Sequence, residues 1–412
     1  MEELNLIPQL RFSEFSEEWE EKMLGEICSV ERGKFTPRPR NNPIYYNGEI
    51  PFVQTGDVVH SKGIINTHSQ TLNEKGLKVS KLFKKGDLLI TIAANIGYAG
   101  VLQYDMACPD SLIGLKCTSQ IKNYFLNYLL EIEQPKMDYL AVAAAQKNIN
   151  IDFLKPYKLS IPIPTEQTKI ATFLTAVDKR INLLQKKKVE LEQYKKGVMQ
   201  KLFSQKLRFK KEDGSDFEDW EEKTLGEIGN TFNGLTGKTK VDFGKGKPYI
   251  QYMQIFSNSR IDTSNFGLVD VDDDENQSIA QFGDVFFTTS SETPNEIGMS
   301  SVLTEQVEDV YLNSFCFGYR PNSLEELVPE FSQFFFRSSK VRKEIIKLAQ
   351  GSTRFNMSKV AFMKLKFNFP KKGEQQKIAN FLSSIDKSIE NISNQIEDSV
   401  MFKKGLLQKM FV

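Results

Sequence analysis

The sequence has few of the residues on which most metal sites and many enzymes depend. It contains four cysteines and two histidines among 412 residues. The cysteines (Cys28, Cys108, Cys117 and Cys316) form no C-x-x-C pair, and together with His60 and His68 they match no usual zinc spacing. We therefore expect reduced, partly buried thiols in a cytoplasmic protein, and no bound metal.

Long apolar runs are also missing. No stretch approaches the roughly 18 apolar residues that a membrane span requires. The chain does not start with a cationic segment followed by an apolar run, so no signal peptide is predicted. The formal net charge of +1 neither favours nor excludes a polyanionic partner, because the distribution of charge matters more than its sum.

Catalytic motifs occur only as fragments. Asn42-Pro43-Ile44-Tyr45 resembles the Asn-Pro-Pro-Tyr motif of amino-methyltransferases, but no glycine-rich cofactor loop precedes it. Gly234 to Thr239 looks like part of a phosphate loop, yet Phe232 stands where that loop needs glycine. Two histidines in one region make a catalytic triad implausible. The chain is therefore predicted to be non-catalytic and to bind no cofactor itself.

What the chain does contain is a long repeat. The stretch from Glu166 to Phe203 returns, 208 positions later, as Glu374 to Phe411. In both copies apolar residues recur at spacings of four and three, which predicts a long helix with one apolar seam against a partner helix. The predicted seam consists of Ile170, Leu174, Val177, Ile181, Leu184, Ile378, Leu382, Ile385, Ile389 and Ile392. It is interrupted at Lys188, Lys195, Ser399 and Lys403. The expected partner of each helix is the other copy.

The segments in front of the helices repeat as well. These repeats are Leu10-Arg11-Phe12 with Leu207-Arg208-Phe209, the Leu-Gly-Glu-Ile segments ending at Ile27 and Ile228, Pro51–Gln54 with Pro248–Gln251, and the predicted strand pairs of Gly86–Leu102 and Gly283–Leu303. We expect helices at 123–133 and 330–350, and closing strands at 158–164 and 364–370. The second helix should run naturally into the N-terminal segment, which brings the termini together in a cyclic arrangement.

The predicted fold class is α+β, with two tandem β-rich α/β domains, each followed by a long helix. The two helices are expected to form an antiparallel coiled coil with pseudo-twofold organisation. The predicted boundaries are 1–165 for the first globular domain, 166–204 for its helix, 205–373 for the second domain and 374–412 for its helix. The framework repeats and the inner loops diverge, as expected of one scaffold that carries two specificities.

Basic loops at equivalent places in the two domains are candidates for contact with DNA. The first contains Arg32, Lys34, Arg38 and Arg40, and the second contains Lys238, Lys240, Lys245 and Lys247. Cations on loops held by a rigid scaffold suit phosphate contacts, and arginine also suits base edges. The alternative is an ordinary solvated loop. The acidic run Asp270–Glu275 would repel phosphates, so we expect it to lie away from any nucleic acid.

A second pair of aligned loops precedes the closing strands. It contains Gln146, Lys147 and Asn148 in the first domain, and Arg354 and Asn356 in the second. Glutamine and asparagine read adenine well in the major groove. Loop capping is an equally common use of such residues.

The whole chain resembles the DNA-specificity subunit of type I restriction-modification systems. The resemblance rests on Glu166-Gln167, Lys169-Ile170-Ala171, Phe173-Leu174 and Asp178, on Glu374-Gln375, Lys377-Ile378-Ala379, Phe381-Leu382 and Asp386, and on the repeated segments before the helices. It implies that each domain is a target recognition domain that reads one half of a bipartite double-stranded DNA site. The helix pair would set the distance between the half-sites.

The resemblance also implies partners. Modification subunits that bind S-adenosylmethionine and methylate adenine would dock on the helices. Restriction subunits, which are helicase-nucleases using ATP and Mg²⁺, would join outside. Two other classes stay open from the residues alone: a self-contained methyltransferase or nuclease, and a coiled-coil adaptor. The missing cofactor loop speaks against the first, and the paired basic loops speak against the second.

Overall fold

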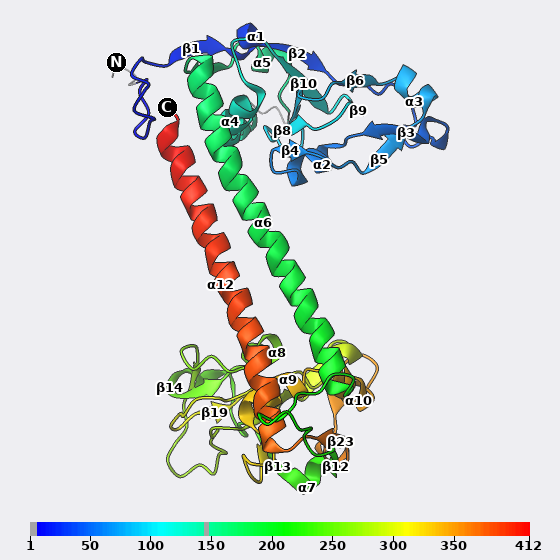
Figure 1. The fold of residues 1–412 in the computed structure, drawn as a ribbon, viewed down its shortest axis with the longest axis vertical. Coiled ribbons are helices and arrows are strands. Elements are labelled where there is room, and N and C mark those ends of the chain that lie inside the picture. The colour runs from blue at the N-terminus through cyan, green and yellow to red at the C-terminus, as the bar shows by residue number, and fades with distance from the viewer. Residues whose placement is uncertain (1–5, 144–147) are drawn as a thin grey trace. The chain divides into compact units, whose positions relative to one another are not determined.

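The computed structural model describes residues 6–143 and 148–412. Its contacts divide the chain into two compact units. Unit 1 consists of Met1–Gln185 and Asn394–Val412, and unit 2 consists of Lys186–Ser393. In Figure 1, unit 1 contains the blue and cyan segments and the red end of the chain. Each unit therefore contains one globular region, the first part of the long helix that follows it and the last part of the other long helix.

The described residues of unit 1 form three small sheets. Their strand orders are β1-β11, β2-β10-β7-β8-β4 and β5-β3-β9-β6. The strands are β1 (Glu20–Met23), β2 (Cys28–Arg32), β3 (Tyr46–Phe52), β4 (Ile64–Ile65), β5 (Gln70–Leu72), β6 (Lys81–Phe83), β7 (Leu88–Thr91), β8 (Ala99–Leu102), β9 (Met106–Cys108), β10 (Leu112–Cys117) and β11 (Lys158–Ile161). The helices are α1 (Leu24–Ile27), η1 (a 3₁₀ turn, Pro43–Tyr45), α2 (Thr55–His60), α3 (Glu74–Lys78), α4 (Asn123–Ala143) and α5 (Ile151–Leu154).

Unit 2 repeats this plan. Its strand orders are β12-β23, β13-β20-β16-β18, β15-β14-β19 and β17-β22-β21. The strands are β12 (Glu221–Thr224), β13 (Gly229–Asn233), β14 (Phe243–Ile250), β15 (Gly267–Val269), β16 (Val285–Thr288), β17 (Ser290–Ser291), β18 (Ser300–Val302), β19 (Tyr311–Leu312), β20 (Cys316–Pro321), β21 (Ala349–Gln350), β22 (Phe355–Met357) and β23 (Lys366–Phe369). The helices are α7 (Leu225–Ile228), η2 (Lys240–Asp242), α8 (Tyr252–Ser257), η3 (Pro294–Glu296), α9 (Pro329–Phe335), α10 (Ser339–Ile346) and α11 (Lys359–Met363).

The two units share their framework strand by strand. The closing strands predicted before the long helices are β11 and β23, and each pairs antiparallel with the first strand of its unit. The four-strand order β2-β10-β7-β8 corresponds to β13-β20-β16-β18. The parallel pair of β3 with β9 corresponds to that of β14 with β19. The fold class predicted from the repeat is thus confirmed.

One predicted helix is wrong in extent. The stretch 330–350 forms two helices, α9 and α10, and its last two residues belong to β21. The break has a local cause, because the Ser338 side chain accepts a hydrogen bond from the Val341 N–H and so begins a new helix.

The long helices are α6 (Pro164–Phe203) and α12 (Lys372–Met410). They pack together, with segments of both helices in each unit. Residues of the predicted seam are not confined to helix–helix contact. Ile170 and Leu174 join the core of unit 1 around Trp19, together with Leu406 from α12. All ten predicted seam residues are buried or half-buried.

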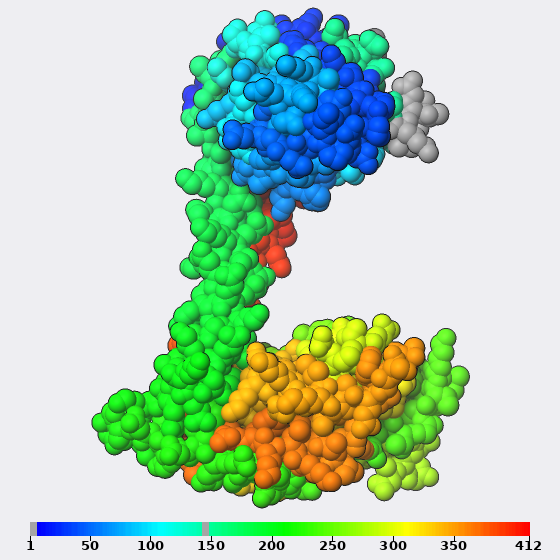
Figure 2. Space-filling model, turned by 90° about the vertical axis from the view of Figure 1, so that its right-hand side faces the viewer, coloured from blue at the N-terminus to red at the C-terminus, as the bar shows by residue number. Residues whose placement is uncertain are grey.

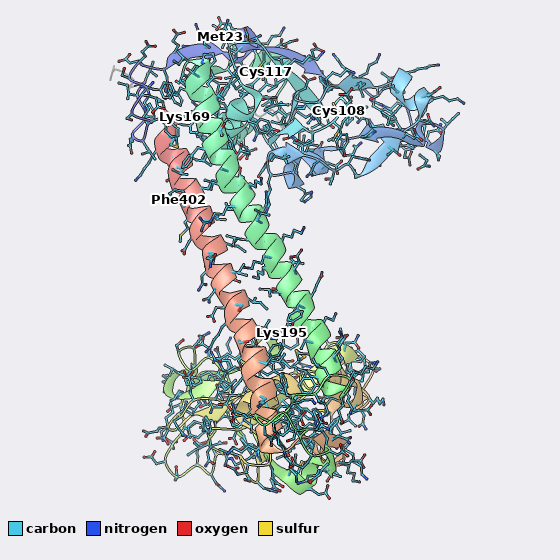
Figure 3. The ribbon with its side chains drawn as sticks, in the orientation of Figure 1. Met23, Cys108, Cys117, Lys169, Lys195 and Phe402 are labelled. Carbon is cyan, nitrogen blue, oxygen red and sulfur yellow. The ribbon has the colours of Figure 1, made fainter. Side chains whose placement is uncertain are left out.

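Two of the three lysines that interrupt the seam, Lys403 and Lys195, form ion pairs across it. Lys403 lies 3.0 Å from Asp178 in unit 1. Lys195, which is labelled on α6 in Figure 3, lies 2.5 Å from Asp386 in unit 2. Along α6 the paired residue number rises while along α12 it falls, which is the pairing of antiparallel helices. A lysine at such a position keeps its charge satisfied at the edge of an apolar seam.

The Glu-Gln pair near the start of each long helix is fully buried. The Gln167 amide donates to the carbonyls of Gln120 and Pro162 and accepts from the Lys122 N–H. Gln375 makes the corresponding three bonds, to Glu326, Pro370 and Val328. Each glutamine therefore connects its helix to the end of the closing strand and to the segment after β10 in unit 1 or β20 in unit 2. The sheets that contain β10 and β20 are called the inner sheets below.

The N-terminal segment of unit 1 lies beside the end of α12. The Leu10 N–H donates to the Lys409 carbonyl at 2.8 Å. In unit 2, where the chain is continuous, the equivalent Leu207 N–H donates to the Lys201 carbonyl at 3.2 Å. The cyclic arrangement of the termini is thus confirmed inside unit 1.

Candidate nucleic-acid interface

The basic loop of unit 1 follows β2 and is held by its own arginines. The Arg40 guanidinium makes two bonds to the Asp110 carboxylate, at 2.7 and 2.9 Å. Arg32 donates to the Asp110 carbonyl at 2.7 Å, and Arg38 donates to the Pro37 carbonyl at 2.8 Å. These contacts fasten the loop to the connection between β9 and β10.

Exposed cations remain on this fastened loop. Lys34 is exposed and forms no ion pair within the part of the chain that the structure describes. Arg38 is exposed, and within the described residues its side chain donates only to carbonyls of its own loop. Loop cations held in place by neighbouring contacts lose little side-chain and backbone freedom when they meet a phosphate.

The basic loop of unit 2 is different, because the acidic run lies against it. Lys238 pairs with Glu275, Lys245 with Asp270 at 2.8 Å, and Lys247 with Asp273 at 2.8 Å. The cause is the antiparallel pairing of β14 with β15, which places the residues after Val269 alongside Lys247. The acidic run thus lies against the basic loop rather than apart from it, and contact of this loop with nucleic acid stays a prediction.

Charge neutralisation weakens the case for the second loop. The hydrogen bond from Lys238 lowers the pKa of Glu275 to about 2, so both partners are charged at neutral pH. Lys240, in η2, is exposed and has no ion pair among residues 6–143 and 148–412. It is the cation of this loop that stays available to a phosphate.

The aligned polar loops occupy equivalent positions in the two units. Asn148 forms a bridge with Ala93, two residues after β7, and Asn356 pairs with Ser290, two residues after β16. Both asparagines are exposed. Arg354 is exposed, and its guanidinium lies 5.9 Å from the centre of the exposed Phe315 ring. Gln146 and Lys147 lie outside the described residues.

Strand registers bring these candidates to one end of the inner sheet. In unit 1 the sheet pairs Arg32 with Ile113 and Thr91 with Leu112. The end of β2, the start of β10 and the end of β7 therefore coincide. In unit 2 the pairs of Asn233 with Phe317 and Thr288 with Cys316 define the same end. In each unit, a basic loop and an asparagine therefore lie at the same end of the corresponding sheet.

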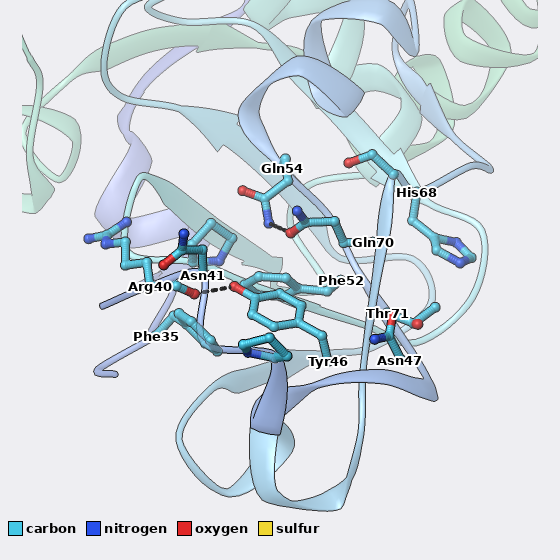
Figure 4. A pocket seen from close by; sticks show the side chains of 13 residues that line it. Phe35, Arg40, Asn41, Tyr46, Asn47, Phe52, Gln54, His68, Gln70 and Thr71 are labelled. Atoms are coloured by element: carbon cyan, nitrogen blue, oxygen red, sulfur yellow. Dashed lines mark hydrogen bonds between the residues drawn. The ribbon is translucent and has the colours of Figure 1, made fainter. Parts of the chain in front are cut away.

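A hollow in unit 1 lies next to this end and was not predicted. Its volume is about 650 Å³, and its lining includes Arg40 and Pro109 (Figure 4). Two glutamines, Gln54 and Gln70, face each other in it. The segment Pro51–Gln54 was recognised as repeated, but the contact of Gln54 with Gln70 depends on the register of β3 and β5, which no local pattern reveals.

None of the helices in residues 6–143 and 148–412 is long and apolar enough to cross a membrane. Across those same ranges, no three or more histidine, cysteine, aspartate or glutamate side chains are grouped as they would be around a metal ion.

Comparison with known families gives one match, which occurs twice. The family described as the type I restriction modification DNA specificity domain matches residues 16–193 and again residues 217–400. The two matches cover most of the chain and follow the repeat found in its sequence.

Curated relatives from Methanocaldococcus jannaschii are similar to the chain. The putative type I restriction enzyme MjaX specificity subunit is 30% identical over 201 residues, which cover 48% of this chain and 45% of the relative. The MjaIX specificity subunit is 26% identical, over 60% of this chain and 61% of the relative. Both matches span less than two thirds of these relatives. The MjaVIII specificity subunit is 22% identical over 95% of this chain and 91% of the relative.

Solved structures share the fold along nearly the whole chain. The type I restriction-modification S subunit from M. genitalium has a TM-score of 0.58 at 18% identity, covering 98% of this chain and 99% of that one. The HsdS subunit from Thermoanaerobacter tengcongensis has a TM-score of 0.52 at 16% identity, covering 95% and 96%. At these identities the likeness concerns the fold.

Proposed function

The chain belongs to the type I restriction modification DNA specificity family, and we propose that it is the non-catalytic subunit that selects the DNA target of a type I complex. The proposal follows from a family match over both halves of the chain. The ligand that it binds is double-stranded DNA, and it acts in the cytoplasm. It needs no cofactor of its own in this role.

Each unit reads one half of a bipartite target. The observation that carries this statement is that equivalent ends of the two inner sheets hold different side chains. In unit 1 this end carries the loop of Lys34 and Arg38, and in unit 2 it carries Arg354, whose guanidinium lies 5.9 Å from the centre of the Phe315 ring. A common scaffold with different residues at the same edge suits two independent readers, with cations for phosphates and amides for base edges.

The paired helices hold the two readers and receive the catalytic partners. Segments of α6 and α12 pack against each other in both units, so a continuous helix links each reader to the other. Figure 2 shows side chains of α6, in green, exposed along one face of the helix. Modification subunits that bind S-adenosylmethionine dock on this frame, and restriction subunits that use ATP and Mg²⁺ join them.

Exchange of the recognition region of unit 1 tests whether each unit reads its own half-site. Residues 29–150 are replaced by the equivalent region of a relative with a different target, and methylated positions are mapped in cells that express the complex. One half of the methylated motif should change while the other half and the spacing stay.

The matched control replaces residues 230–358, the equivalent region of unit 2. That exchange should alter the opposite half of the motif. If either exchange changes both halves, the units are not independent readers. If the unaltered complex methylates no bipartite sequence, the chain is not a specificity subunit.

A further inference from the structure

The hollow of unit 1 has an aromatic floor. Phe35, Tyr46 and Phe52 pack together there, with ring centres 5.1 Å apart for Phe35 and Phe52 and 5.7 Å apart for Phe35 and Tyr46. Phe35 and Phe52 are almost fully buried. A packed floor of this kind fixes the strands around it, so polar groups along its rim keep their positions.

Two glutamines lie above this floor in the view of Figure 4. The Gln54 amide donates from Nε2 to Oε1 of Gln70 at 3.2 Å. The Asp57 carboxylate holds both segments, because it accepts from the Gln54 backbone N–H at 2.8 Å and from the Ser69 backbone N–H at 3.1 Å. Both side chains are therefore positioned before any ligand arrives.

The hydrogen-bonding groups left over form a defined pattern. After the mutual bond, Gln54 keeps its Oε1 acceptor and one N–H, and Gln70 keeps two N–H donors. One acceptor beside one donor on a planar amide matches the N6 amino group and N7 of adenine in the major groove. Gln70 determines which way the Gln54 amide faces, since it accepts one of its protons.

Unit 2 has a glutamine equivalent to Gln54 but no residue equivalent to the Gln70 side chain. The register pairs Phe52 with Gln70 in unit 1 and Tyr249 with Gly267 in unit 2. Gln251 thus corresponds to Gln54, while a glycine replaces Gln70. A side chain at Gly267 is blocked, because a Cβ there would lie 2.5 Å from the Tyr249 ring. The position differs between the units although the surrounding strands are the same, as expected where two half-sites are read.

We propose that Gln54, oriented by Gln70 across the hollow, reads the edge of an adenine in the half-site of unit 1. The proposal rests on the proposed function and names a base-reading pair for it. The hollow also borders the basic loop, since Arg40 lines it and the Arg40 carbonyl accepts from the Tyr46 hydroxyl at 2.6 Å. A base reader beside phosphate-binding cations is the usual arrangement of a DNA interface.

The test uses the whole chain in complex with its modification subunits and selects bound DNA from a randomised pool. Gln54→Met removes the amide and keeps the length of the side chain. Gln70→Gly installs the residue that unit 2 has. The control, Gln120→Met, alters an exposed glutamine of unit 1 outside the hollow.

Gln54→Met should reduce the preference for adenine at one position of one half-site by about 5- to 150-fold, the loss expected for one bidentate contact. Gln70→Gly should reduce the same preference less, because it removes only the orienting bond. The other half-site and the Gln120→Met complex should be unchanged.

Three results overturn the proposal: an unchanged motif, uniform weakening over both half-sites, or a lost preference for a base other than adenine. Failure of the proposed function is recognised separately. In that case the unaltered complex selects no bipartite sequence at all.

Discussion

At the residue scale, one buried carboxylate in each unit connects the start of the long helix to the segment that precedes the globular region. Glu166 accepts two bonds from Arg11, at 2.8 and 2.7 Å. Glu374 accepts two from Arg208 and a third from the Trp220 indole N–H at 2.9 Å. The equivalent indole N–H of Trp19 has no acceptor among the described residues. Glu374 therefore satisfies one more buried donor than Glu166 does.

Glu374→Ala should lower the free energy of unfolding of unit 2 by about 3 kcal/mol. The buried Trp220 indole N–H loses its acceptor, and the Arg208 guanidinium loses its two bonds to Glu374 but keeps those to the Phe217 and Glu218 carbonyls. Glu166→Ala should lower that of unit 1 by about 2 kcal/mol. The chain has two tryptophans, one in each unit. Urea unfolding followed by fluorescence in Trp19→Phe and Trp220→Phe backgrounds therefore separates the units. Equal losses would show that the indole bond contributes nothing.

Glu275 tests whether the acidic run restrains the basic loop of unit 2. The hydrogen bond from Lys238 lowers the pKa of Glu275 to about 2, from an ordinary value of about 4.3. A lowered carboxyl pKa stabilises the fold above the ordinary value, and this stability is lost as the pH falls through about 2. Between pH 8 and pH 5 the pair thus stays charged, and the pH should not release Lys238.

Glu275→Gln should release it at any of these pH values. If Lys238 then contacts a phosphate, the slope of log K against log salt for DNA binding should steepen by about 0.9. The control is Asp274→Asn, which changes the charge equally in the same acidic run. Asp274 is exposed and has no ion pair within the described part of the chain. Equal slopes in the two variants would mean that Lys238 does not reach the DNA.

At the element scale, two of the three lysines that interrupt the apolar seam, Lys403 and Lys195, have unequal surroundings. Lys403 lies 3.0 Å from Asp178, 3.2 Å from Glu131 and 5.3 Å from the centre of the Tyr128 ring. The Tyr128 hydroxyl also donates to Asp178 at 2.7 Å. Lys195 has Asp386 and, at 5.1 Å, the ring of Phe334. The contact between α6 and α12 is thus more strongly charged in unit 1.

Lys403→Met should therefore destabilise unit 1 by about 2 kcal/mol, because a half-buried aspartate loses its cation. Lys195→Met should destabilise unit 2 by less than about 1 kcal/mol, because Asp386 is more exposed. The measurement is urea unfolding read by Trp19 for the first variant and by Trp220 for the second. A larger effect of Lys195→Met would contradict this ranking.

At the scale of the whole molecule, the units divide at Gln185 in α6 and at Ser393 in α12. Residues inserted after Gln185 and after Ser393 therefore fall at the boundary between the units and leave the contacts within each unit in place. A heptad of seven residues keeps the apolar seam in register. It lengthens a helix by about 10 Å, which corresponds to about three base pairs of DNA.

If the helices set the spacing of the half-sites, the heptad variant should methylate a motif whose unread gap is longer by about three base pairs. Rotation along the groove by roughly 100 degrees can lower its affinity or change that gap by one. Insertion of two residues at both positions is the control, and it should break the seam and destabilise the protein. An active heptad variant with the original gap would exclude the helices as the determinant of spacing.

The sequence alone determined the duplication, the two long helices, the closing strands and the strand pairs at Gly86–Leu102 and Gly283–Leu303. The reason is that each of these is encoded by a local period or by a motif that occurs twice. A helix such as α6 keeps its apolar residues at a fixed spacing whatever lies beside it. The recurrence of Glu-Gln marked both helix starts, although its bonding pattern could not be foreseen.

Only the tertiary structure decided which loops are charged and which are neutralised. Lys247 and Asp273 are 26 positions apart and meet because β14 pairs with β15. Gln54 meets Gln70 through the register of β3 and β5, and each long helix is divided between two units by packing. Such contacts join segments that no periodicity links, because side chains across a strand pair are selected by register and space rather than by their neighbours in sequence.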